Sequence, residues 1–164
     1  MKISGIYSFN KGKEFIEANY SHLLKEIKKV IKCIKAEGHR TKKSKEKTMI
    51  GKMLYNPKSL NIAYKTEFAK YSWTNHRERC EYSKGFYTKE HMPKDMKGKP
   101  FREMDFIKEK LGVEVQFGKY SFMVYNVCAK MTIFKNLGHI NAGVEIVPIK
   151  QFADNMSTGV SYFE

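Results

Sequence analysis

A carboxylate and an amide stand two residues apart inside an otherwise apolar run of sequence, LGVEVQFGKYSF at 111–122. Because successive side chains of a β-strand point to opposite faces, Glu114 and Gln116 would project from the same face. Val113 and Val115 would then pack on the other face. The run therefore predicts a buried strand that presents two polar groups together, an arrangement that can serve metal binding or catalysis.

A second carboxylate lies nine positions earlier, where Asp105 begins a short strand candidate, DFI. If this strand pairs antiparallel with the strand that carries Glu114, the two carboxylates converge at one end of a hairpin. Two carboxylates at close range repel each other unless one is protonated or a cation bridges them. Mg2+ is the usual bridging ion because it prefers oxygen ligands. The alternative is a surface salt bridge to Lys108 or Lys119.

The elements that would position these residues follow from hydrophobic periodicity and turn residues. Apolar residues recur with the helical period over 14–37, with Gly38 as the C-terminal cap. Residues 74–100 are polar and contain Gly and Pro, so we expect mostly irregular structure there. The order strand, strand, helix, strand in the C-terminal half indicates a mixed α/β core with a βαβ crossover. The other predicted elements are helices over 59–71 and 120–136, a short helix over 149–156, and strands over 3–9, 105–107, 112–117 and 142–148.

The chain carries a formal net charge of +14, from 31 Lys and Arg against 17 Asp and Glu. A surface this basic attracts polyanions, and its contacts with phosphates release counterions. Nucleic acid is therefore the leading class of partner, ahead of a purely solubilising surface and of a membrane surface. No apolar run approaches the roughly 18–20 residues that span a bilayer, and the N-terminus lacks the apolar region of a signal peptide. We expect a soluble, cytoplasmic protein.

The segment HRTKKSKEKT at 39–48 concentrates this charge, because five of its ten residues are Lys or Arg. It shows no hydrophobic period, so we expect a loop. Its basic and hydroxyl side chains suit contact with a phosphate backbone, although a flexible surface loop has the same composition. We interpret the lysines on the free face of the 14–37 helix as an ordinary solvated face.

Cysteine and histidine give no metal-binding pattern in the sequence. The three cysteines have no CxxC spacing, and we interpret them as small hydrophobic residues. The five histidines are scattered, and no two have the i,i+4 spacing of a metal site on one helix. The carboxylates at 105 and 114 are therefore the leading candidates for a metal site.

The arrangement of Asp105, Glu114 and Gln116 resembles the nuclease pattern of an Asp followed by Glu-x-Lys, with Gln in the place of the Lys. This variant resembles the BglII/BstYI branch of the type II restriction endonucleases, in the PD-(D/E)xK nuclease superfamily, and its BstYI-like members above all. The resemblance covers nearly the whole chain. The segments that carry it are RTKKSKEKT at 40–48, LYNPKSLN at 54–61, DF at 105–106, VEVQFGKYSF at 113–122, GVEIVPIK at 143–150 and STGVSYFE at 157–164.

The resemblance implies a single endonuclease domain over 1–164, with a mixed β-sheet core flanked by helices. It implies a homodimer that clamps a palindromic DNA duplex and cuts both strands with Mg2+, while a DNA methyltransferase protects the cell's own DNA. The expected site is centred on GATC, of the form RGATCY, and cleavage would leave GATC 5′ overhangs. Family members have a longer segment between Trp73 and Asp105 and continue beyond Glu164, so we expect a C-terminal truncation. The alternative is a DNA-binding remnant that has lost catalysis.

The resemblance also assigns roles to individual residues of the site. Asp105, Glu114 and the backbone carbonyl of Val115 would bind the metal ion. Gln116 would orient the attacking water, since an amide cannot act as a general base. A position shortly after Trp73 helps to organise that water in the family, and the sequence leaves both Asn75 and His76 open for this role.

Base recognition in such enzymes comes from two places, the segment after the catalytic strand and a loop near the C-terminus. These places correspond to Lys119 and to Ser157 and Thr158, whose side chains can hydrogen bond to base edges. For Lys119, a phosphate contact or a solvated side chain is the alternative. The basic segment would hold the DNA backbone through Arg40, Lys42, Lys43, Ser44, Lys45 and Lys47.

Overall fold

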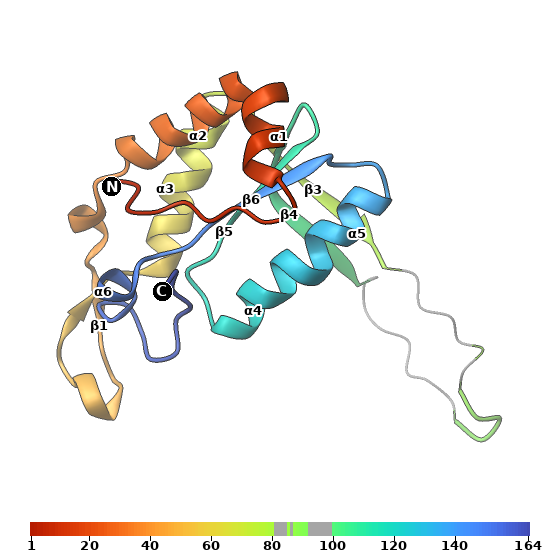
Figure 1. Cartoon of the computed structure of the whole chain (residues 1–164). Helices are drawn as coiled ribbons and strands as arrows, with labels where there is room; N and C mark the ends of the chain where they lie inside the picture. The colour runs from red at the N-terminus through yellow and green to blue at the C-terminus, as the bar shows by residue number, and fades with distance from the viewer. Residues whose placement is uncertain (81–84, 86, 92–99) are drawn as a thin grey trace.

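The computed structural model describes residues 1–80, 85, 87–91 and 100–164, and its centre is a four-stranded mixed sheet (Figure 1). The strands lie in the order β3-β4-β5-β6. Strand β4 pairs antiparallel with both β3 and β5, and β6 runs parallel to β5, which confirms the predicted α/β core and its crossover. Their bounds are β3 (Thr74–Arg79), β4 (Phe101–Lys108), β5 (Leu111–Val115) and β6 (Ala142–Ile146).

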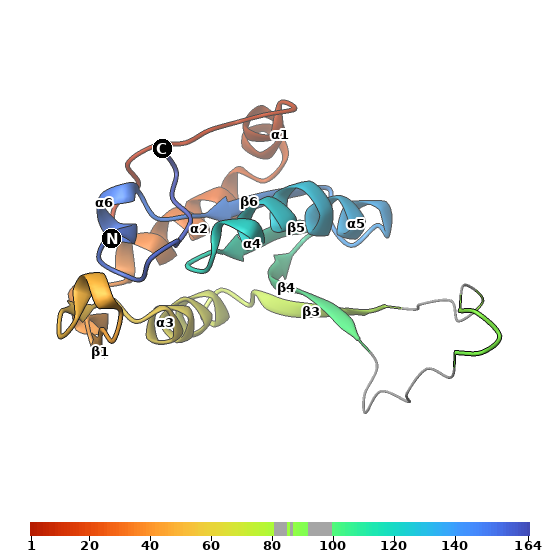
Figure 2. The same cartoon turned by 90° about the horizontal axis from the view of Figure 1, so that it is seen from below.

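Helices cover the sheet from both sides (Figures 1 and 2). The main core lies between the sheet and two helices, α2 (Ser21–Cys33) and α3 (Pro57–Ala69). The crossover helix lies on the other side of the sheet and connects β5 to β6. Its helical segments follow one another without a break. This helix consists of α4 (Tyr120–Tyr125), a π-helical turn η4 (Asn126–Lys130) and α5 (Met131–Asn136).

A β-bulge interrupts the pairing of β3 with β4 close to Asp105. Thr74 pairs with Ile107 and His76 with Met104, so β4 has one residue more than β3 in this interval. Regular alternation would place Met104 and Phe106 on one face. Instead, Met104 packs in the small cluster under α5, whereas the Phe106 ring stacks on α3. The bulge thus redirects the side chains around Asp105, as bulges near functional sites do.

The N-terminal third differs from the prediction in two respects. Residues 3–9 do not form a strand, because they pair with no strand of the sheet. The expected helix over 14–37 is two helices, α1 (Gly12–Asn19) and α2, with a break at Tyr20, whose φ of −134° lies outside the helical region. Helix α2 ends before Gly38, since Ile34 turns to an extended conformation that buries its side chain. Gly38 lies instead in a 3-10 turn, η1 (Ala36–His39).

The segment predicted as a basic loop is a small hairpin. Strand β1 (Lys42–Lys43) pairs antiparallel with β2 (Met53–Leu54), and a 3-10 turn η2 (Lys47–Met49) lies between them. Strand β3 lies in the stretch predicted to be irregular, and residues 81–84, 86 and 92–99 of that stretch lie outside the described residues. The short C-terminal helix α6 (Lys150–Ala153) lies beside the hairpin (Figure 1).

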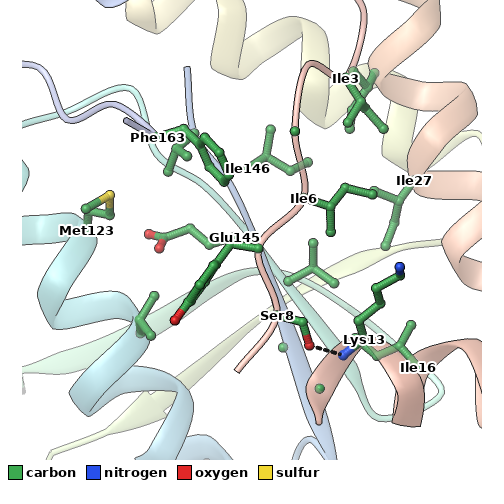
Figure 3. Close-up of a pocket in the computed structure, with 18 of the residues that line it drawn as sticks. Ile3, Ile6, Ser8, Lys13, Ile16, Ile27, Met123, Glu145, Ile146 and Phe163 are labelled. Atoms are coloured by element: carbon green, nitrogen blue, oxygen red, sulfur yellow. Dashed lines mark hydrogen bonds between the residues drawn. The ribbon is translucent and has the colours of Figure 1, made fainter. Parts of the chain in front are cut away.

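A large open cavity of about 1400 Å3 lies between the N-terminal segment, β6 and the crossover helix. Its lining is mostly apolar, with Ile3 and Ile6 from the N-terminal segment and Met123 from α4 (Figure 3). Glu145 of β6 projects among these side chains. In the described part of the chain, no helix combines the length and apolar character needed to cross a bilayer.

Candidate active site

The two carboxylates singled out in the sequence lie next to each other. Phe106 of β4 pairs with Val113 of β5, which brings Asp105 beside Glu114 and confirms the predicted antiparallel convergence. The Asp105 backbone N–H donates to Glu114 Oε1 at 3.3 Å, and the Val115 N–H donates to Asp105 Oδ2 at 3.0 Å. Each carboxylate is therefore oriented by the backbone of the opposite strand.

A lysine of the crossover helix completes this pair. Lys130 Nζ lies 2.8 Å from Glu114 Oε2 and donates to the Glu103 carbonyl at 3.0 Å. Both side chains of the ion pair are nearly closed off from water, with exposures of 11% for Lys130 and 3% for Glu114. Sequence reasoning missed Lys130. It is one of two charged residues in the apolar stretch 120–136, and a charge in apolar surroundings is a signal that could have singled it out.

Burial and, second, the charge of Asp105 raise the pKa of Glu114 to about 7. Lys130 and the hydrogen bond from the Asp105 backbone act on this pKa in the opposite direction. The acidic pair thus concentrates negative charge in a poorly solvated place, where a cation stabilises the ionised form.

Gln116 lies two residues further along the chain, and its hydrogen bonds lead away from the acidic pair. Its Nε2 donates to the Lys119 carbonyl at 3.2 Å, and its Oε1 accepts from Asn126 at 3.4 Å. Asn126 also donates to Glu145 Oε1 at 3.2 Å. A Cβ at Gly118 would lie 2.9 Å from Gln116 Nε2, so glycine leaves room for this amide.

A small cavity of about 130 Å3 opens beside Asp105. Asn75 lines it and donates through Nδ2 to Glu103 Oε1 at 2.7 Å. His76 is the next residue of β3 and contacts Glu78 and His139 instead. Of the two alternatives that the sequence left open, Asn75 lines the small cavity together with Asp105, whereas His76 contacts Glu78 and His139.

The residues expected to recognise bases lie together with the basic hairpin, although Lys119 follows residues 40–47 by more than 70 positions in sequence and Ser157 and Thr158 follow them by more than 100. Lys42 donates through its ammonium group to the Ser157 hydroxyl, and Lys119 donates to the Thr158 carbonyl. The Thr158 backbone N–H donates to Glu46 at 3.0 Å. Hydrogen bonds from Thr158 also lower the pKa of Glu46 from its usual value. This surface is called the hairpin–loop surface below, and it comprises residues 40–47, Lys119, Ser157 and Thr158.

The members of this surface differ in exposure. Lys43, Lys45 and Lys47 are exposed, whereas Ser44 is 3% exposed and its hydroxyl accepts from the Glu46 backbone. Ser44 therefore stabilises the turn, and the exposed lysines are better placed than its hydroxyl to contact a partner. Arg40 is half-buried and donates to Asn155 Oδ1 at 3.0 Å.

The chemistry of the acidic pair fits a hard divalent cation. Asp105, Glu114 and the Val115 backbone would supply oxygen ligands only, which is the donor set that Mg2+ prefers. The Lys130 ammonium group against Glu114 shows that this pocket accepts positive charge. The donor set thus matches the ion that the sequence suggested.

This mixed sheet, flanked by helices and carrying an acidic pair on adjacent strands, has the fold of the restriction endonucleases. The family model for the restriction endonucleases BglII/BglIII matches residues 4–164. The chain therefore belongs to the BglII/BglIII restriction endonuclease family.

Two solved structures show the same fold. The crystal structure of restriction endonuclease BglII complexed with a DNA 16-mer is 22% identical over 94% of this chain, with a TM-score of 0.66. Free BglII is 20% identical over 90% of this chain, with a TM-score of 0.53. The chain spans 62% and 60% of the lengths of these two BglII chains. A comparison with curated proteins finds no match.

Proposed function

We propose that this chain is a type II restriction endonuclease, which hydrolyses phosphodiester bonds of double-stranded DNA at a specific site with Mg2+. The observation that carries the proposal is the Asp105–Glu114 pair on adjacent strands, in a chain that belongs to the BglII/BglIII family. The net charge of +14 supports DNA as the substrate. Residues 1–164 would form a single endonuclease domain.

Asp105, Glu114 and the Val115 carbonyl would hold the magnesium ion. When bound, such an ion lowers the pKa of a water molecule and stabilises negative charge on the scissile phosphate. Lys130 keeps Glu114 paired with a positive charge in the absence of the ion. The Val115 N–H fixes the orientation of Asp105. Asn75, from its place in the small cavity, would hold the attacking water by a hydrogen bond.

Gln116 stands where related nucleases have a lysine, and this departure supports the BstYI-like assignment. Its amide cannot take a proton from water, so we assign it an orienting role. Its hydrogen bond to the Lys119 carbonyl links the catalytic strand to the hairpin–loop surface, and the bond it accepts from Asn126 links that strand to the crossover helix. Gln116 would thus connect base recognition to the site of cleavage.

The hairpin–loop surface would contact the DNA. Lys119, Ser157 and Thr158 would read base edges, and the exposed lysines of the hairpin would contact phosphates. The proposed target is a palindrome centred on GATC, of the form RGATCY, cut to leave GATC 5′ overhangs by a homodimer. A DNA methyltransferase in the same restriction-modification system would protect the host genome.

A second candidate function is sequence-specific DNA binding without catalysis. Two observations favour it: Lys130 forms an ion pair with Glu114, and the hydrogen bonds of Gln116 lead away from the acidic pair. In this case, the hairpin–loop surface would bind DNA and the acidic pair would not support hydrolysis.

Replacement of Glu114 by Ala distinguishes the two candidates. We expect cleavage of a duplex that contains RGATCY to fall by at least about 10^3-fold, because the developing charge loses several kcal/mol of stabilisation. Binding to the same duplex, measured by fluorescence anisotropy, should change less than about threefold. Glu109→Ala is the matched control, since Glu109 is an exposed carboxylate of the β4–β5 turn. Cleavage by Glu114→Ala at the wild-type rate would contradict the catalytic assignment.

A further inference from the structure

Three ionisable side chains gather on β3 and on the turn after α5, away from the acidic pair. His76 and Glu78 are two residues apart on β3 and share a face, and His139 follows the crossover helix. Glu78 Oε2 lies 2.7 Å from His139 Nε2 and 3.5 Å from His76 Nε2. One ligand atom from each of the three residues lies within 4.8 Å of the other two.

The two imidazole rings are held in place by a buried aromatic ring and by the backbone. Their centroids lie 4.2 Å apart, and the fully buried ring of Phe134 packs against both. Gly138 has a φ of +77°, which favours glycine and turns the chain back after α5. The His139 backbone N–H then donates to the Phe134 carbonyl at 2.9 Å. The backbone at His139 is therefore fixed relative to α5, independently of the cluster.

The spacing suits a tetrahedral metal ion. Ligands about 2.0 Å from Zn2+ are roughly 3.3 Å from one another in tetrahedral geometry. The His76–Glu78 separation of 3.5 Å is already close to this value, and the His139–Glu78 separation of 2.7 Å needs a small opening. Side-chain exposures of 40%, 30% and 28% for His76, Glu78 and His139 leave the cluster open to solvent on one side. An ion could enter there and keep a water molecule as its fourth ligand.

We propose that His76, Glu78 and His139 form a binding site for a first-row transition-metal ion, with Zn2+ as the expected occupant. Two imidazoles and one carboxylate form a known zinc ligand set with one open position. The set discriminates against Mg2+, which prefers oxygen ligands and an octahedral shell. The proposed site is therefore chemically distinct from the acidic pair and requires a different metal.

The ion would fasten β3 to the crossover helix. Strand β3 is an edge strand, paired only with β4 among the described strands, and it carries Asn75 next to His76. A metal ion that connects β3 to the turn after α5 would hold this strand in place. The ion would bind on the face of β3 opposite to the small cavity. The proposed role is structural, so bound zinc should raise the melting temperature.

The test is a Co2+ titration followed by visible absorption, which reports the ligand field directly. The protein carries no histidine tag, and Cys33 and Cys128, both exposed, are replaced by Ser so that thiolates do not contribute. We expect one Co2+ per chain, displaced by Zn2+ and unaffected by excess Mg2+. His139→Ala and His76→Ala should weaken binding at least about 100-fold, because each removes one of three ligands.

His22→Ala is the matched control, since His22 forms an exposed pair with Glu109 at 2.9 Å without a third ligand. It should retain the full Co2+ spectrum. Glu78→Gln is a second test variant, because it keeps the size and hydrogen bonding of the side chain but removes its charge, and it should also lose the spectrum. Zn2+ should raise the melting temperature of the parent protein and not that of Glu78→Gln. Absence of stoichiometric Co2+ binding, or equal binding by folded His139→Ala and the parent, would overturn the proposal and leave a hydrogen-bonded cluster only.

Discussion

At the scale of single residues, the ion pair of Lys130 with Glu114 decides the electrostatics of the site. Glu114 is almost fully buried, and its pKa of about 7 reflects burial first and the neighbouring Asp105 second. Lys130 opposes both effects. Removing one partner of a buried ion pair leaves the other charge unpaired. This costs more folding free energy than the intact pair contributes.

We expect Lys130→Met to lower the free energy of unfolding at pH 8 by about 2–4 kcal/mol. The loss should shrink toward pH 6, where Glu114 takes up a proton and no longer needs a partner. The double variant Lys130→Met/Glu114→Gln should recover most of the stability at pH 8. Urea denaturation at both pH values measures these differences, and a Lys130→Met protein as stable as wild type at pH 8 would contradict the role given to the pair.

Glu145 provides a second pH-dependent prediction at this scale. Burial raises its pKa to about 7 from the usual 4.5, while the Asn126 hydrogen bond and the Lys130 charge lower it. The folded state therefore binds the proton more tightly than the unfolded state between pH 4.5 and 7. Stability should fall as pH rises through this window, and the full penalty should be present above pH 7.

Glu145→Gln keeps an acceptor for Asn126 and removes the charge. We expect the variant to gain stability over wild type as pH rises from about 5 to 8, by on the order of 1–2 kcal/mol for a partly buried side chain. Urea denaturation across this range measures the difference. A constant difference between the two proteins across the range would show that Glu145 does not titrate there.

Much of the acidic pair could be predicted from the sequence, because alternation in two short strands fixes which side chains converge. The apolar surroundings of Lys130 could single it out, but its pairing with Glu114 could not be predicted, since it depends on how the crossover helix rotates over the sheet. The same limit applies to His139, which joins His76 and Glu78 only through the turn after α5. A search for histidines with i,i+4 spacing cannot find this cluster, because two of its residues lie on a strand and the third lies in a distant turn.

At the scale of elements, the helix predicted over 59–71 is confirmed as α3, which begins two residues earlier and ends two residues earlier than predicted. The Asn56-Pro57 sequence starts α3, where Asn56 Oδ1 accepts from the Lys58 N–H at 3.0 Å and from the Ser59 N–H at 3.4 Å. Strand β3 was missed because its sequence, TNHRER, is polar, as suits an edge strand. The break at Tyr20 and the bulge near Asp105 arise from tertiary packing that no local pattern encodes.

The cap of α3 is directly testable. Asn56→Ala removes both hydrogen bonds to the first turn and should cost about 1 kcal/mol of stability. Lys58→Ala, an exposed change in the same turn, is the control and should stay within about 0.5 kcal/mol of wild type. Chemical denaturation measures both variants. If the two variants prove equally stable, the side chain of Asn56 does not cap the helix.

At the scale of the whole molecule, the net charge of +14 should make the proposed DNA binding strongly salt-dependent. The sequence predicted the fold class and the polyanionic partner class. It did not show that the basic hairpin, Lys119 and the 157–158 loop would form one surface. These segments meet through long-range contacts, which the local sequence pattern of each segment does not predict.

We expect replacement of Lys43, Lys45 and Lys47 by Ala to weaken DNA binding. The slope of log K against log salt should become shallower by about 0.9 for each phosphate that the variant no longer neutralises. A triple Ala replacement of Lys28, Lys29 and Lys32, exposed on α2, is the charge-matched control. Binding titrations at several salt concentrations give both slopes. Equal slopes for the two triple variants would show that the hairpin has no special role.

The central claim is site-specific, metal-dependent cleavage, and a digest tests it most directly. Purified protein is incubated with unmethylated plasmid DNA in the presence of Mg2+ or of EDTA, and the ends of any fragments are sequenced. We predict discrete fragments with GATC 5′ overhangs in Mg2+ and intact plasmid in EDTA. Intact plasmid under both conditions, together with selective binding to GATC-containing duplexes, would contradict the claim and identify a DNA-binding protein without nuclease activity.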